Sequence, residues 1–169
     1  ANELREVQLG DARLNKRLVK VVGTLASHAA SSVPEACDSW AETKGVYRLR
    51  DSLRVTPQAI RQAHRQSTVE RVEGLDAVLV VQDTTTLDVS HRPATKGVGP
   101  LDRPSRQGVK VHSALAVSTQ GVPLGIIHQQ DWVRDPDTVG KKHKRHQLET
   151  KDKESQRWLS ALEATQESM

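Results

Sequence analysis

The sequence predicts an α+β protein, with a small all-α part over residues 1–74 and a part over residues 75–169 that holds three strands and a helix. Two observations carry this prediction. Apolar residues before residue 74 recur at helical spacing behind capping residues, and at Ala77 the pattern changes to β-branched runs. The 169 residues are 36% hydrophobic and 27% charged, which allows a packed core and excludes a fully disordered or collagen-like chain.

The first predicted helix covers residues 12–30. The carboxylate of Asp11 can accept hydrogen bonds from the free amides of the first turn. At 100° per residue, one arc of the helix is apolar and holds Leu14, Leu18, Val21, Val22 and Leu25. The neighbouring arc is basic and holds Arg13, Lys16, Arg17 and Lys20. The helix is therefore amphipathic, with a basic stripe beside its buried face.

Two further helices are predicted before residue 74. Ser39 and Glu42 have the spacing of a capping box, which begins a helix near residues 40–50. Thr56 followed by Pro57 begins another, which runs to about Val72. Gly74 closes this third helix.

The strands are predicted after Ala77. Residues 77–81 form a short β-branched run that we expect to be buried on both faces and to end at Gln82-Asp83. A polar stretch of about 25 residues follows, which is long for a structureless loop and indicates a functional segment. Residues 109–117 and 122–128, separated by the turn 118–121, predict a hairpin. The last predicted helix covers about 152–166.

Three clusters of polar residues invite functional interpretations. Asp83 and the threonines after it follow a buried run, where a carboxylate can enter a crevice; the alternative is a structural cap after a strand. The basic stripe can contact a DNA backbone, and the alternative is a solvated helix face. The basic run Lys141–His146 fits a mobile basic loop near nucleic acid.

The composition also limits compartment and partners. The formal net charge is +4, and Cys37 is the single cysteine, which excludes an internal disulfide framework and fits a reducing cytoplasm. No stretch approaches 18 apolar residues, and the charged start is not a secretory signal, so we expect a cytoplasmic protein without a membrane partner.

A series of short motifs occurs along nearly the whole chain in a shared order. They are Leu9–Leu14, Val33–Cys37 with Trp40–Lys44, Val46–Leu49, Gln82–Thr85, Lys110–Ser113, Gly125–Gln129 with Trp132, and Lys153–Ser155 with Trp158-Leu159. In this order and spacing the sequence resembles bacterial cut-and-paste transposases of insertion-sequence family four, the group that includes the transposon-five transposase.

The resemblance implies a helical N-terminal DNA-binding domain followed by the first strands of an RNase H-like catalytic domain. In this family two Asp and one Glu, the DDE carboxylates, hold two Mg²⁺ or Mn²⁺ ions for DNA cleavage and strand transfer, and Asp83 matches the first Asp. Arg13 and Arg17 match positions that contact transposon-end DNA, whereas Leu14 stands where some relatives carry a basic side chain. The expected DNA-binding residues are Arg13, Lys16, Arg17, Lys20 and Lys44.

The second Asp and the Glu find no match in this chain. Asp83 alone makes an incomplete metal site. We therefore expect no stably bound metal and no cleavage by the chain alone. Asp88 is a poor substitute, because five positions along a strand place it on the opposite face from Asp83.

The leading hypothesis is thus the N-terminal part of a transposase with double-stranded transposon-end DNA as its partner and a homodimer on that DNA as a candidate assembly. The alternatives are a truncated DNA-binding regulator or inhibitor of transposition, and a hydrolase that uses Asp83 as nucleophile.

Overall fold

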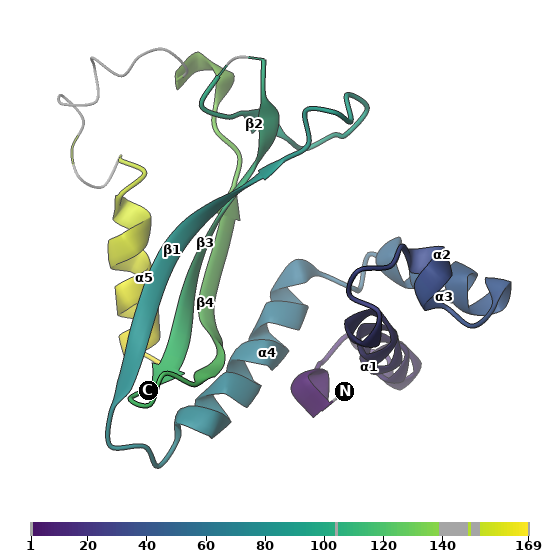
Figure 1. The fold of residues 1–169 in the computed structure, drawn as a ribbon, viewed down its shortest axis with the longest axis horizontal. Helices are drawn as coiled ribbons and strands as arrows, with labels where there is room; N and C mark the ends of the chain where they lie inside the picture. Colours follow the sequence, from purple (N-terminus) through teal and green to yellow (C-terminus); the bar gives the residue numbers. More distant parts are fainter. Residues whose placement is uncertain (1, 104, 139–148, 150–152, 169) are drawn as a thin grey trace. The chain divides into compact units, whose positions relative to one another are not determined.

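The computed structural model describes residues 2–103, 105–138, 149 and 153–168, and the chain divides into two compact units, Ala1–Glu70 and Arg71–Met169 (Figure 1). The first unit is helical, as predicted. Its elements are η1 (Asn2–Leu4), α1 (Ala12–Ser27), α2 (Val33–Ala36), α3 (Trp40–Arg50) and most of α4 (Pro57–Val72). The second unit carries a four-stranded sheet and a helix, so the predicted α+β class is confirmed.

Side-chain caps fix where the main helices begin. Asp11 accepts a hydrogen bond from the Arg13 amide at 2.8 Å, which begins α1 as predicted. The Ser39 hydroxyl accepts from the Glu42 amide at 3.2 Å and begins α3. The Thr56 hydroxyl accepts from the amide of Ala59 at 3.2 Å and begins α4. α1 ends at Ser27, three residues before the predicted end, and the short α2 was not predicted from the sequence.

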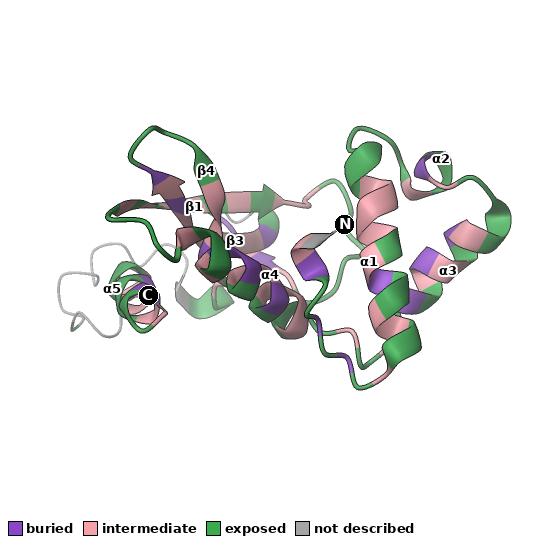
Figure 2. Cartoon of the chain, turned by 90° about the horizontal axis from the view of Figure 1, so that it is seen from below, coloured by how far each residue is buried: buried purple, intermediate pink, exposed green. Residues whose placement is uncertain are grey.

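The core of the helical unit lies where these elements meet. Leu18 of α1 is buried, and the other apolar residues of its predicted arc are partly buried, which confirms the arc. α1 and α3 contact each other, and Figure 2 colours their buried positions, which are Leu18 in α1 and Thr43, Val46 and Leu49 in α3. The buried cluster consists of Leu4, Val7, Leu9, Leu18, Leu49 and Ala63.

The sheet is antiparallel throughout and centres on β3 (Gln107–Ser118), which pairs with β1 (Val78–Asp88), β2 (Gly99–Pro100) and β4 (Pro123–Trp132). The predicted hairpin is β3–β4. The two-residue β2 lies within the polar stretch, where no strand was predicted. The predicted end of the first strand at Gln82-Asp83 is wrong: pairing continues from Val78 opposite Ser118 to Asp88 opposite Gly108. The threonines after Asp83 favour this extension, because β-branched residues fit a pleated strand.

The two faces of the sheet differ. α5 (Gln156–Gln166) packs against β3 and β4, and on that side Ala114 and Ala116 are fully buried. On the opposite face of β1, Leu79, Val81 and Leu87 are 53–55% exposed. The prediction that the first strand is buried on both faces is therefore wrong, because the described residues cover one face only. No described helix is long and apolar enough to cross a membrane.

Candidate nucleic-acid interface

The predicted basic stripe of α1 is exposed in the structure. We call its four residues, Arg13, Lys16, Arg17 and Lys20, the α1 arc; all four side chains are solvent-exposed. Within the described part of the chain, Arg13, Lys16 and Arg17 form no ion pair, so their charges remain available to an anionic partner. Lys20 differs, because its Nζ lies 3.0 Å from Oε1 of Glu42, and this carboxylate raises the pKa of Lys20.

A second cationic surface lies on α3 and was only partly predicted. At 100° per residue, Trp40, Lys44 and Arg48 fall within an arc of about 80°, opposite the buried Thr43, Val46 and Leu49. We call these three residues the α3 outer face. Trp40 is 66% exposed, and the Nζ of Lys44 lies 5.5 Å from its ring centroid. Lys44 was predicted from the sequence. Trp40 and Arg48 were missed, although their i, i+4, i+8 spacing with Lys44 is a readable signal.

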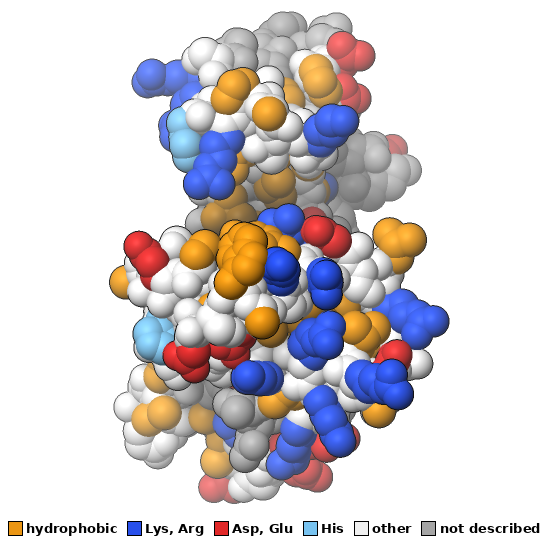
Figure 3. Space-filling model, turned by 90° about the vertical axis from the view of Figure 1, so that its right-hand side faces the viewer, with side chains coloured by type: hydrophobic (Ala, Val, Ile, Leu, Met, Phe, Trp, Pro, Cys, Tyr) orange, Lys and Arg blue, Asp and Glu red, His pale blue; other side chains and the backbone are white. Residues whose placement is uncertain are grey.

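The ion pair between Lys20 and Glu42 joins α1 to α3. Glu42 also accepts a hydrogen bond from the Asp38 amide at 3.0 Å, and these two donors lower its pKa, with Lys20 as the larger cause. The pair uses the charge of Lys20 within the protein and leaves the other three cations of the α1 arc unneutralised. Figure 3 shows Lys and Arg side chains gathered over the helical unit, with few acidic side chains between them. An exposed surface with this charge suits contacts to phosphate.

Asp83 lies in the middle of β1 rather than at its end. Its side chain is exposed on the uncovered face, opposite Ser113 of β3, whose hydroxyl accepts a hydrogen bond from Gln129 of β4 at 3.0 Å. Among the described residues, Asp83 makes no hydrogen bond or ion pair. The alternative that Asp83 is a structural cap therefore finds no support, since a cap would accept hydrogen bonds from backbone amides.

The two neighbours of Asp83 point to the other face and hold a buried histidine. Nδ1 of His112 is 2.8 Å from the Thr84 hydroxyl, and Nε2 is 3.0 Å from Oε1 of Gln82. His112 is fully buried, its ring centroid lies 4.8 Å from that of Trp158 in α5, and burial lowers its pKa. The side chains of Gln82 and Thr84 thus hold His112 on the face of the sheet opposite Asp83.

Asp88 lies on the α5 side of β1, as the parity of the strand predicted. It accepts hydrogen bonds from the hydroxyl and amide of Ser90 and forms an ion pair with Arg106, and these contacts lower its pKa to about 2. Asp88 thus has a structural role. No group of three or more His, Cys, Asp or Glu side chains that could hold a metal ion occurs among the described residues.

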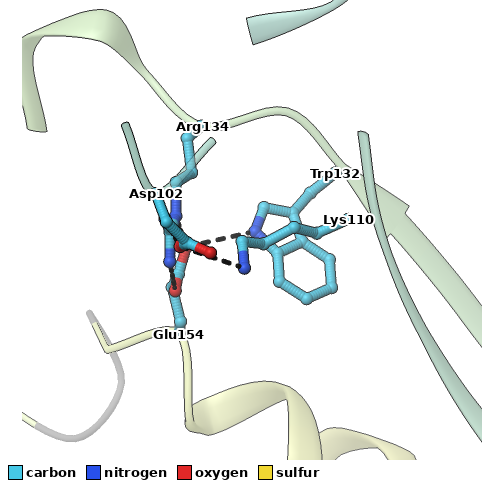
Figure 4. A network of polar contacts seen from close by, with 5 residues as sticks. All are labelled: Asp102, Lys110, Trp132, Arg134 and Glu154. Atoms are coloured by element: carbon cyan, nitrogen blue, oxygen red, sulfur yellow. Dashed lines mark hydrogen bonds and ion pairs between the residues drawn. The ribbon is translucent and has the colours of Figure 1, made fainter. Parts of the chain in front are cut away.

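An ion-pair network fixes the beginning of α5 to the sheet (Figure 4). The guanidinium of Arg134 donates two hydrogen bonds of 2.6 Å to the carboxylate of Glu154 and one of 2.8 Å to Asp102. Trp132 Nε1 donates to Glu154 at 3.4 Å, and Lys110 Nζ lies 3.7 Å from Asp102. Arg134 lowers the pKa of Glu154 to about 2, and Glu154 in turn raises the pKa of Arg134.

The fold and its charged helical surfaces define a candidate DNA-binding protein. Comparison with known families supports this: residues 1–55 match the family model described as transposase DNA-binding. The matched segment includes η1, α1, α2 and α3, and hence the α1 arc and the α3 outer face. The match supports a transposase N-terminal region that recognises DNA. The predicted basic loop Lys141–His146 lies outside the described residues.

Proposed function

We propose that this chain is the N-terminal part of a cut-and-paste transposase of insertion-sequence family four, and that its helical unit binds the ends of the transposon. The observation that carries the proposal is the coincidence of two findings in one segment. Residues 1–55 match a transposase DNA-binding family, and the same residues carry the α1 arc and the α3 outer face, both exposed.

The two surfaces suit different kinds of contact. Arg13, Lys16 and Arg17 present charges on successive turns of α1, and such cations bind DNA by releasing counterions from the phosphates. Trp40 beside Lys44 offers an apolar ring next to a cation, which suits sugar and base edges as well as phosphate. Lys20 contributes less to this binding, since it is already paired with Glu42.

The test compares a double substitution in the α1 arc with a matched control. The DNA probes are duplexes that the unmodified chain selects from a pool with randomised base pairs. Arg13→Ala with Arg17→Ala should bind these duplexes with lower affinity, and the loss of affinity should be largest at low salt. The control, Arg5→Ala with Arg50→Ala, removes the same charge from cations that are already paired with Glu70 and Asp51. Equal affinities of the two variants would refute the assignment of the α1 arc.

For catalysis we propose that Asp83 is the first of the three carboxylates that the family uses. Its support is the match of Gln82–Thr85 to the family motif, together with an exposed carboxylate that has no partner among the described residues. Two-metal cleavage requires further carboxylates to fix both ions. In a full-length protein that supplies them, Asp83→Asn should abolish metal-dependent cleavage and leave end recognition intact; retained cleavage would refute the role.

The second candidate function is regulation of transposition by DNA binding without catalysis. The match of residues 1–55 to a transposase DNA-binding family supports the DNA-binding part of this candidate. Both candidates predict that the purified chain neither nicks nor joins DNA with Mg²⁺ or Mn²⁺. Cleavage that disappears in Asp83→Ala would contradict this expectation. The reading frame beyond Met169 separates a fragment of an enzyme from a short regulator.

A further inference from the structure

One end of the sheet carries a group of cations that the proposed function does not use. Arg92 and Lys96 lie in the loop between β1 and β2, and Arg103 lies in the connection from β2 to β3. All three side chains are exposed, and none forms an ion pair with another residue in the described ranges. Figure 3 shows Lys and Arg side chains exposed at the upper end of the view, the level at which Figure 1 draws this loop.

The two acidic residues within residues 88–106, Asp88 and Asp102, are both paired within the protein. Asp88 at the end of β1 is paired with Arg106. Asp102 is paired with Arg134 at 2.8 Å and with Lys110 at 3.7 Å. Within residues 88–106 the charge left over is therefore positive, and it is carried by the three unpaired cations.

The base of the two loops is tightly packed. A Cβ on Gly99 would lie 2.5 Å from the Arg134 carbonyl oxygen, and one on Gly108 would lie 2.0 Å from the Leu87 carbonyl oxygen, so both positions require glycine. Leu101 between them is buried, and the Val89 amide donates to the Gln107 carbonyl at 2.9 Å. Because the loops leave a fixed base, less backbone entropy is lost when they bind a partner than in an unanchored segment.

We propose that Arg92, Lys96 and Arg103 form a second DNA-binding surface, which contacts the phosphate backbone of duplex DNA independently of the matched residues 1–55. The chemistry favours phosphate over bases, since residues 89–106 contain no Phe, Trp or Tyr on which a base could stack. The proposal of this surface rests on the proposed function only in that DNA is the partner. It gives a role to the long polar stretch after β1.

The test uses the whole chain and a 30-base-pair duplex of arbitrary sequence, with binding measured by fluorescence anisotropy at several salt concentrations. The loop variant is Arg92→Gln, Lys96→Gln and Arg103→Gln. The control is Thr119→Glu, Gln120→Glu and Gln166→Glu, which changes the net charge by the same amount at exposed positions. Thr119 and Gln120 follow β3 at the other end of the sheet from these loops.

Each lost phosphate contact should make the negative slope of log affinity against log salt shallower by about 0.9. The slope of the loop variant should therefore be shallower by about 2 to 3. Its affinity near 0.1 M salt should fall at least tenfold below that of the control, by about 0.9 decade for each contact. Circular dichroism of both variants should match the unmodified chain, because the substituted side chains make no structural contact.

Each outcome decides between the two proposals. A loop variant with the affinity and slope of the control would overturn the second surface and leave the α1 arc untouched. A loop variant that loses affinity while Arg13→Ala with Arg17→Ala does not would support the second surface and refute the role of α1. An unmodified chain that does not bind the duplex at 0.05 M salt would overturn both.

Discussion

The substitution Glu154→Gln should destabilise the second unit, in a way that depends on pH. Glu154 accepts two hydrogen bonds of 2.6 Å from Arg134, which lower its pKa from 4.5 to about 2. That difference corresponds to about 3 kcal/mol of unfolding free energy at pH 7 if the whole interaction is counted. The side chain is 33% exposed, so solvent screens the pair, and we expect a loss of about 1–2 kcal/mol.

The sign of the pH dependence follows from the direction of the pKa change. A carboxylate whose pKa is lower in the folded state stabilises the fold fully above its unfolded pKa, and this stabilisation is lost as the pH falls through the folded value. The difference between wild type and Glu154→Gln should therefore be constant above pH 5 and shrink between about pH 4.5 and pH 2. Asp88 titrates in the same range in both proteins, so its contribution cancels in the difference.

The assay is urea unfolding followed by tryptophan fluorescence in a Trp40→Phe background, which leaves Trp132 and Trp158 of the second unit as probes. Glu163→Gln, at an exposed position of the same helix, is the control and should change stability by less than about 0.5 kcal/mol. A Glu154→Gln midpoint equal to that of the control at pH 7, or a difference that does not shrink down to pH 3, would refute the reasoning.

Three more predictions concern the sheet and its neighbours. His112→Leu should destabilise the second unit by about 1–3 kcal/mol, because the polar groups of Gln82 and Thr84 lose their buried partner; a thermal midpoint close to wild type would contradict this. Gly108→Ala should cost about 1–3 kcal/mol through overlap with the Leu87 carbonyl, whereas Gly45→Ala in the open part of α3 should be stabilising by up to about 1 kcal/mol; denaturant midpoints that fail to separate the two would contradict the close packing. Asp83→Asn and Asp83→Ala should each change stability by less than about 0.5 kcal/mol, and a larger loss would restore the structural interpretation of this carboxylate.

The helical unit could be predicted from the sequence because its signals are local. Asp11, Ser39 and Thr56 accept hydrogen bonds within three residues of themselves, so the residues that begin each helix stand beside it in the sequence. The exposed and buried arcs of α1 follow from a single period for the same reason.

The course of β1 could not be predicted in the same way. Gln82 and Asp83 interrupt the apolar run, which indicated an end, but the strand continues because β3 offers backbone partners as far as Gly108. Whether Leu79 and Val81 are exposed likewise depends on which face of the sheet α5 covers. A β-branched run has the same sequence pattern whether one face or both faces of the strand are covered. Trp40 and Arg48 carried a readable helical spacing, yet their exposure required knowledge of which side of α3 is buried.

The two hydrogen bonds of the His112 ring also fix the register of β1 against β3. The two ring nitrogens bind the side chains of Gln82 and Thr84, which are two positions apart. A shift of β1 by one residue would break both bonds and turn the carboxylate of Asp83 toward the face of the sheet that α5 covers. If one residue between Val78 and Val81 is deleted, Gln82 and Thr84 can keep their bonds to His112 only when a residue of the preceding loop enters the strand. We therefore expect natural or engineered length changes in this region to be tolerated in the loop before Val78 and rejected within the strand itself.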